Sequence, residues 1–195
     1  MPSSSFHIST QAPSDMKWVA DSGRYNSAMI AIHWLTALLM FCIIPIGLTM
    51  TAMSREAPAR EVLFTIHKSI GITILALVVL RVIVRALSRA PDYPRTLGRL
   101  EHVTASAVQY LLYVVMVWMC VSGYVTSLAG GHGFDWFFLF SVPDFVPHDR
   151  ALQHLASTVH VAGQWAVYTL ITAHVLGAVF HLVVRRDRVF QRMLP

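Results

Sequence analysis

The apolar run from Val159 to His174 limits most strongly how this chain can fold. It contains no Asp, Glu, Lys or Arg, and it carries His160 and His174 fourteen residues apart. On an α-helix, fourteen residues make almost four turns, so the two imidazoles lie within about 40° of each other and about 21 Å apart along the axis. That distance is most of the ~30 Å hydrocarbon thickness of a bilayer. Ionisable side chains at two depths on one face of a membrane helix indicate a functional site.

The composition of the 195 residues agrees with a membrane protein. The chain is 55% hydrophobic and 13% charged, whereas soluble domains carry about 25% charged residues. The net charge is +5, but the basic residues flank the apolar runs, which indicates membrane topology and not a nucleic-acid partner. Cys42 and Cys120 lie inside apolar runs and are expected to be buried thiols, not a disulfide.

Four apolar runs are long enough to cross a bilayer, and they predict an all-α membrane protein built as a bundle of four transmembrane helices. The predicted spans are residues 27–50, 62–84, 103–128 and 158–184. Residues 1–26 are expected to form a polar cytoplasmic tail, and residues 27–195 a single membrane domain. The connection 129–157 contains an aromatic run, Trp136-Phe137-Phe138-Leu139-Phe140, that is too short to span. We expect it to be a short interfacial segment between the third and fourth helices.

The distribution of basic residues predicts the orientation. With four spans, the N-terminal tail, the second connection and the C-terminus share one side. That side holds Lys17, Arg24, Arg81, Arg85, Arg89, Arg95, Arg99, Arg185, Arg186, Arg188 and Arg192. The other side holds Arg55, Arg60, Lys68 and Arg150. The positive-inside rule therefore predicts that both termini are cytoplasmic.

This topology sorts the four membrane histidines into two levels. His33 lies with His174 towards the cytoplasm, and His67 lies with His160 towards the outside. Facing imidazoles in a bundle interior predict bis-histidine ligation of two haem irons, an inner one and an outer one. For any single histidine, a helix–helix hydrogen bond or a proton relay is an alternative. A single tetrahedral metal site cannot use all four histidines, because the two levels lie about 21 Å apart.

The same fourteen-residue interval recurs elsewhere. Arg81 follows His67 by fourteen residues, which puts it at the level of the inner pair as a candidate partner of a haem propionate. Gly47 follows His33 by fourteen residues, and it has no side chain to obstruct the outer haem.

These motifs resemble the bacterial cytochrome b-561 family. The resemblance rests on Ile32-His33-Trp34, on Ile66-His67-Lys68-Ser69-Ile70-Gly71 with Arg81, and on His160 and His174 followed by His181, and it extends over roughly residues 24–195. It implies a four-helix protein of the bacterial inner membrane with two non-covalent b haems, held by His33, His67, His160 and His174. It also implies electron exchange with membrane quinone, with superoxide as a proposed donor at the outer face.

We therefore expect transmembrane electron transfer that reduces ubiquinone, in an oxidoreductase whose donor is superoxide or another small molecule. His181 is a candidate quinone contact, and the alternative is an interfacial histidine that reaches water. Lys68 and Arg150 are candidates for steering an anion to the outer haem, and the alternative is that they are solvated charges. Neither the donor and acceptor nor the oligomeric state follows from the residues.

Two other functions remain open at this stage. The chain is also compatible with a haem-bearing anchor subunit of a larger dehydrogenase or hydrogenase, whose partner would bind the tail or the connection 129–157. Reduction of a metal ion at the outer haem is the other alternative, since it too needs only an exposed haem edge.

Overall fold

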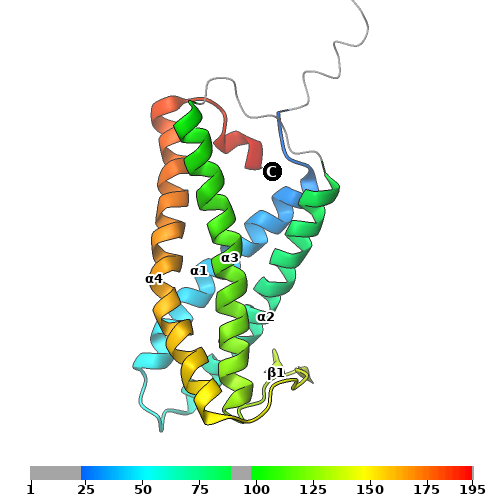
Figure 1. The fold of residues 1–195 in the computed structure, drawn as a ribbon, viewed down its shortest axis with the longest axis vertical. Helices are drawn as coiled ribbons and strands as arrows, with labels where there is room; N and C mark the ends of the chain where they lie inside the picture. Colours follow the sequence, from blue (N-terminus) through cyan, green and yellow to red (C-terminus); the bar gives the residue numbers. More distant parts are fainter. Residues whose placement is uncertain (1–22, 89–97, 195) are drawn as a thin grey trace, which may run out of the picture.

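Four long helices make up most of the computed structural model, which describes residues 23–88 and 98–194 (Figure 1). They are α1 (Ser27–Ala52), α2 (Pro58–Leu87), α3 (Arg99–Ala129) and α4 (Arg150–Phe180). All four are long and apolar enough to cross a membrane, so the predicted helical bundle is confirmed. Most of the predicted tail, residues 1–22, lies outside the described residues, as do Arg89 and Arg95 of the second connection.

The helices begin where capping groups satisfy their free N–H groups. Asn26 accepts from the N–H of Met29 at 2.7 Å ahead of α1, and Asp149 accepts from the first N–H groups of α4. α4 therefore begins eight residues before its predicted membrane span. The extra turns contain Arg150, Gln153 and His154, which kept them out of the predicted span, and the Asp149 cap extends the helix through them.

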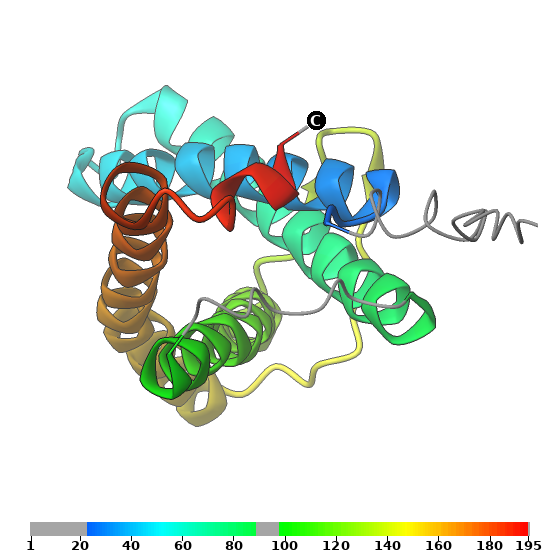
Figure 2. The same ribbon diagram turned by 90° about the horizontal axis from the view of Figure 1, so that it is seen from above.

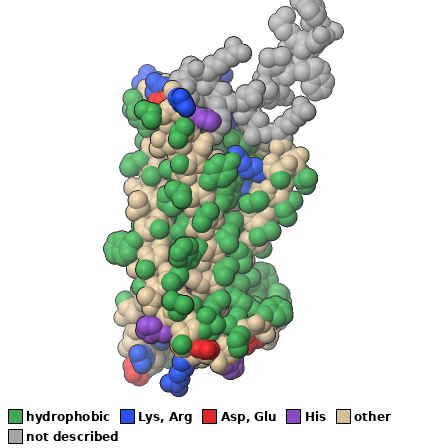
Figure 3. Space-filling model, in the orientation of Figure 1, with side chains coloured by type: hydrophobic (Ala, Val, Ile, Leu, Met, Phe, Trp, Pro, Cys, Tyr) green, Lys and Arg blue, Asp and Glu red, His purple; other side chains and the backbone are tan. Residues whose placement is uncertain are grey.

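The surface has the distribution of side chains that lipid requires. Hydrophobic side chains cover the middle of the bundle, and charged side chains gather at its two ends (Figure 3). Large apolar side chains such as Phe41 and Trp165 are 65% and 68% exposed. Without a surrounding apolar phase this exposure would be unfavourable, so the outer face is suited to acyl chains.

The helices do not all pack equally. α1 packs on α2, α2 on α3 and, most extensively, α3 on α4, whereas α4 makes little close backbone contact with α1 or α2. Figures 1 and 2 show α3 and α4 running together while α1 crosses at an angle. The tightest apolar cluster joins α2 to α3 through Ile70, Ile74, Val78 and Met116. Side chains that connect α4 to α1 and α2 therefore have to reach across the interior.

The aromatic connection between α3 and α4 forms a small hairpin. Strand β1 (Asp135–Trp136) pairs antiparallel with β2 (Phe140–Ser141). It is anchored on α2: the N–H of Phe137 donates to Ser69 Oγ at 2.8 Å, and Trp136 Nε1 donates to Thr73 Oγ1 at 3.1 Å. The segment was expected to be interfacial because of its aromatic rings, and the structure adds specific hydrogen bonds that tie it to α2.

The C-terminal residues turn back over one end of the bundle. After α4 a π-helical turn, His181–Arg185, leads to a 3-10 turn, Phe190–Met193. Trp34 Nε1 of α1 donates to the carbonyl of Met193 at 2.6 Å. Trp34 also packs its ring against His33, with the centroids 5.3 Å apart. The C-terminal segment thus covers the end of the bundle at which His33 lies.

Candidate functional site: two histidine pairs

The structure brings the four membrane histidines together as two pairs. His33 of α1 and His174 of α4 have ring centroids 6.1 Å apart, with ring planes at 66°. His67 of α2 and His160 of α4 have ring centroids 6.4 Å apart, with ring planes at 79°. We call these the inner pair and the outer pair. α4 contributes one member to each, and the imidazoles bridge the interior where the helices themselves are not in close contact.

The separation of the rings suits a metal ion between them. With metal–nitrogen bonds of about 2.0 Å, and about 1.1 Å from each nitrogen to its ring centroid, two opposed imidazoles place their centroids about 6.2 Å apart. Both pairs lie close to that distance. Within the described residues no group of three or more His, Cys, Asp or Glu side chains could hold a metal ion. Each pair therefore suits a metal centre that takes two ligands from the protein, as haem iron does, better than a tetrahedral site that takes three or four.

The outer pair is oriented by its surroundings. His160 Nδ1 lies 2.9 Å from the carbonyl of Met119 and 3.1 Å from Ser122 Oγ. A carbonyl can only accept, so Nδ1 carries the proton and Nε2 keeps the lone pair that a metal needs. His67 Nδ1 is buried and has no hydrogen-bond partner in the described structure.

Glycines make room for both rings of the outer pair. A Cβ atom on Gly47 of α1 would lie 3.0 Å from Cε1 of His67, and one on Gly123 of α3 would lie 2.9 Å from Cε1 of His160. Any larger residue at either position would displace the ring. Gly47 was predicted to leave space near the outer pair, and the structure shows that the space is filled by the histidine itself.

Arg81 lies at the inner pair, at the level that the fourteen-residue interval predicted. Only 8% of it is exposed, and its Nη1 donates to His33 Nδ1 at 3.0 Å. Its guanidinium lies 5.5 Å from the ring centroid of Tyr113 on α3. Arg81 Nε and Tyr113 Oη are both buried without a hydrogen-bond partner in the described structure. Two unpaired donors in one buried place suit a carboxylate acceptor.

The contact with Arg81 fixes the tautomer of His33. A guanidinium only donates, so His33 accepts at Nδ1, and the proton of its neutral ring lies on Nε2. A metal bond at Nε2 needs that nitrogen free of its proton. Ligation through Nε2 and the hydrogen bond from Arg81 therefore exclude each other, and Arg81 has to change partner when a metal binds.

His181, expected to be either a quinone contact or an interfacial histidine, is largely buried at the end of α4. The residue is 8% exposed, and its Nδ1 lies 2.7 Å from Asp187 Oδ2. Burial alone would raise the pKa of Asp187, but the hydrogen bonds from His181 and the Val189 N–H, with the charge of Arg185, hold that pKa below its usual range. Sequence reasoning did not find Asp187, because the turn that brings it to His181 follows the helix and cannot be read from the spacing.

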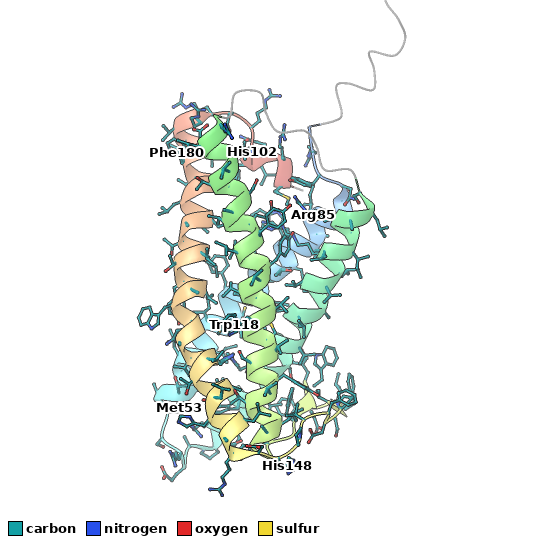
Figure 4. The ribbon with its side chains drawn as sticks, in the orientation of Figure 1. Met53, Arg85, His102, Trp118, His148 and Phe180 are labelled. Carbon is teal, nitrogen blue, oxygen red and sulfur yellow. The ribbon has the colours of Figure 1, made fainter. Side chains whose placement is uncertain are left out.

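Lys68 and Arg150 lie at the other end of the bundle from His181. Lys68 Nζ donates to the carbonyl of His132 at 3.3 Å and lies 5.2 Å from the ring centroid of Phe134. Arg150 is exposed at the first residue of α4, where it lines a surface pocket with His132, His148 and His154. Figure 4 shows His148 at this end and His102 and Phe180 at the opposite end. Both cations are thus near the outer pair's end, but the structure gives them no shared contact.

Comparison with known proteins identifies the family to which the chain belongs. The family described as Prokaryotic cytochrome b561 matches it over residues 24–195. The chain belongs to the prokaryotic cytochrome b561 family. Cytochrome b561 homolog 2 of Escherichia coli (strain K12) is 29% identical over 171 residues, covering 88% of this chain and 91% of the relative. Cytochrome b561 homolog 1 of the same strain is 25% identical over 179 residues, covering 88% and 97%. Cytochrome b562 of Cereibacter sphaeroides is 25% identical over 174 residues, covering 87% and 94%.

Membership of the cytochrome b561 family gives the general function. The chain is a multi-pass bacterial membrane protein that uses b-type haem to transfer electrons across the membrane. The residues at the two pairs fit that group. The ring separations suit a single iron between each pair, glycines accommodate the outer rings, and Arg81 with Tyr113 lacks an acceptor at the inner pair.

Proposed function

We propose that this cytochrome b561 relative carries electrons through two b haems, an inner one held by His33 and His174 and an outer one held by His67 and His160. The separation of the two imidazoles in each pair, 6.1 and 6.4 Å between centroids, is the observation that carries the proposal. Haem iron cycles between its ferric and ferrous states, which supplies the one-electron chemistry. The protein's part is to fix the ligands at two depths of one bundle.

Each residue around the pairs has a defined part in this proposal. Met119 and Ser122 hold the His160 ring with Nε2 available, as a hydrogen-bonded partner commonly does for a metal-bound imidazole. If a haem is bound, Arg81 would leave His33 and, with Tyr113, could donate to a propionate carboxylate. That exchange would remove the conflict at His33 Nδ1 and give a partner to Arg81 Nε and Tyr113 Oη, which have none in the described structure.

We also propose that the electrons are exchanged with membrane quinone, ubiquinone being the candidate, and that a small anion such as superoxide is the donor at the outer pair. Lys68 and Arg150 support the second part, because both cations lie at that end of the bundle. The quinone contact proposed for His181 would have to use Nε2, since Nδ1 is engaged by Asp187.

The haem content of purified protein tests the main proposal. A pyridine haemochrome assay should give two b haems per chain for the wild type and one for either His160→Ala or His174→Ala. His154→Ala, an exposed histidine on the same helix, is the matched control and should keep both. A wild type that binds fewer than two haems would contradict the proposal.

Superoxide-dependent reduction of quinone tests the proposed donor. The rate should fall in Lys68→Gln and Arg150→Gln with both haems retained, and added salt should reduce the wild-type rate more than that of the variants, because screening weakens steering. Equal rates and equal salt dependence in all three proteins would exclude the steering role of these two residues.

A further inference from the structure

His181 and Asp187 form a nearly buried pair beyond the inner histidines. Their side chains are 10% and 6% exposed, and Nδ1 of the ring lies 2.7 Å from Oδ2 of the carboxylate. His181 follows His174 by seven residues, so it projects from nearly the same face of the helix about 10 Å further along the axis. A pair that can hold a charge therefore lies close to the inner site without touching its ligands.

The backbone is strained where it presents Asp187. Its two neighbours, Arg186 and Arg188, have φ values of 52° and 63°, the left-handed region that non-glycine residues seldom adopt. Asp187 Oδ1 also accepts from the N–H of Val189 at 3.2 Å. Such conformations persist only where other contacts determine them, and they concentrate at functional sites. Here they orient one carboxylate onto one imidazole.

The hydrogen bond determines which nitrogen of His181 can take a proton. Nδ1–H donates to Asp187, so the lone pair of the neutral ring lies on Nε2. The carboxylate is ionised at neutral pH, because its pKa lies below the usual range. Nε2 is therefore the nitrogen of His181 that can bind a further proton.

Other charged groups lie at this end of the bundle. On the same turn Arg185 pairs with Glu101 of α3 at 2.8 Å. Arg186 and Arg188 flank Asp187 in sequence. Towards the inner pair, Arg81 of α2 contacts His33, and ahead of α1 Arg24 binds the carbonyl of Leu194. Of these groups, Arg185 acts on the pair directly, since its charge helps to lower the pKa of Asp187.

Resting on the proposed inner haem, we propose that the His181–Asp187 pair is a proton-binding site coupled to electron uptake at the inner histidines. Each electron that arrives between His33 and His174 adds a negative charge about 10 Å away, a distance at which charges interact in a protein interior. One proton from the water at this end of the bundle then binds Nε2 of His181. It leaves when the electron leaves, so charge and protons balance in each cycle.

Potentiometric titration of the haem-loaded, full-length protein tests this coupling. The inner haem is identified as the component that His174→Ala lacks. From about pH 5.5 to about pH 8.5, the range in which histidine titrates, its midpoint potential should fall as pH rises. In His181→Leu the midpoint potential should no longer depend on pH in this range. In Asp187→Asn it should still depend on pH, but over a lower pH range, because a neutral amide stabilises a bound proton less than a carboxylate does. His154→Leu, the same change at the far end of α4, should titrate like the wild type.

Proton uptake gives a second readout that does not depend on turnover. Reduction of the wild type in weak buffer with an indicator dye should take up more protons per inner haem than reduction of His181→Leu. The coupling would be overturned if the wild type holds two haems but its inner midpoint potential does not depend on pH. It would also be overturned if the pH dependence persists in His181→Leu. Either result leaves the proposed function intact. A wild type without an inner haem would overturn the proposed function and the coupling with it.

Discussion

At the scale of single residues, the outer pair depends on the lack of a side chain at Gly47 and Gly123. Each imidazole occupies space that a methyl group would fill. A glycine inside a helix lowers helix stability by about 1 kcal/mol relative to alanine. These two positions therefore make the helices less stable but leave space for the imidazoles. Helix stability and haem binding should therefore respond in opposite directions to the same substitution.

Gly123→Ala tests that opposition directly. The new Cβ would lie 2.9 Å from Cε1 of His160, and overpacking of this kind costs about 1–3 kcal/mol. We expect the affinity for the outer haem to fall about tenfold, measured by haem titration of the apoprotein, with the helical circular dichroism unchanged. Gly177→Ala on α4 is the matched control, because nothing lies within 4 Å of its added Cβ. Equal affinity in both variants would contradict the role given to Gly123.

The single residues differ in how far the sequence predicted them. His33, His67, His160 and His174 could be paired from their positions in four alternating spans, because helical geometry converts sequence intervals into depth and direction. Tyr113 and Asp187 could not be found in this way. Their significance depends on which helix or turn lies opposite them, and one sequence carries no information on that.

At the scale of elements, the four helices follow from apolar length, but the hairpin between α3 and α4 does not. Hydropathy identified the aromatic run 136–140 only as too short to span. Its two strands exist because Ser69, a fully buried residue of α2, accepts from the N–H of Phe137. A partner 68 residues away determines the local structure, which no local pattern can predict.

Ser69→Ala should release the hairpin. The substitution leaves the Phe137 N–H without its partner, which costs about 1–3 kcal/mol for a buried donor. We expect limited proteolysis to cut residues 130–149 several times faster than in the wild type. Thr51→Ala removes a hydroxyl that bonds only within its own helix, so its digestion rate should not change. A Ser69→Ala protein that resists proteolysis equally well would mean that other contacts hold the hairpin.

The turn after α4 should loosen in acid. The folded pKa of Asp187 is below its usual range, so the ionised carboxylate contributes its full stabilisation above the unfolded pKa of about 3.9. That contribution declines below this pH and is lost as the pH falls through the folded pKa. Amide exchange at Val189, corrected for intrinsic rates, should accelerate over that range in the wild type. In Asp187→Asn, exchange of the Val189 amide should already be faster at neutral pH and should change little as the pH falls.

At the scale of the whole molecule, both ends of the described chain lie at the same end of the bundle. The N–H of Tyr25 donates to the carbonyl of Arg192 at 3.2 Å, so this feature of the predicted topology agrees with the structure. Which side of the membrane this end faces is a separate prediction, made from the excess of basic residues around it.

Fusion proteins test the orientation. A fluorescent protein attached after Pro195 should fluoresce, and alkaline phosphatase at the same position should be inactive, because both results report a cytoplasmic end. Alkaline phosphatase inserted between α1 and α2, at Glu56, should be active. The reverse pattern would place the inner pair on the outside and invert the proposed direction of proton uptake.

Finally, α4 supplies one histidine to each pair, and it is the last of the four membrane helices to be synthesised. In the proposed assignment, the outer site would gain its second ligand only after His160 has been translated, and the inner site only after His174. A nascent chain that stalls after α3 would expose His33 and His67 as unmatched imidazoles, with no partner to exclude stray metals or free haem. If the proposed assignment holds, cofactor insertion would be delayed until α4 has been translated, and a product truncated before α4 would complete neither pair.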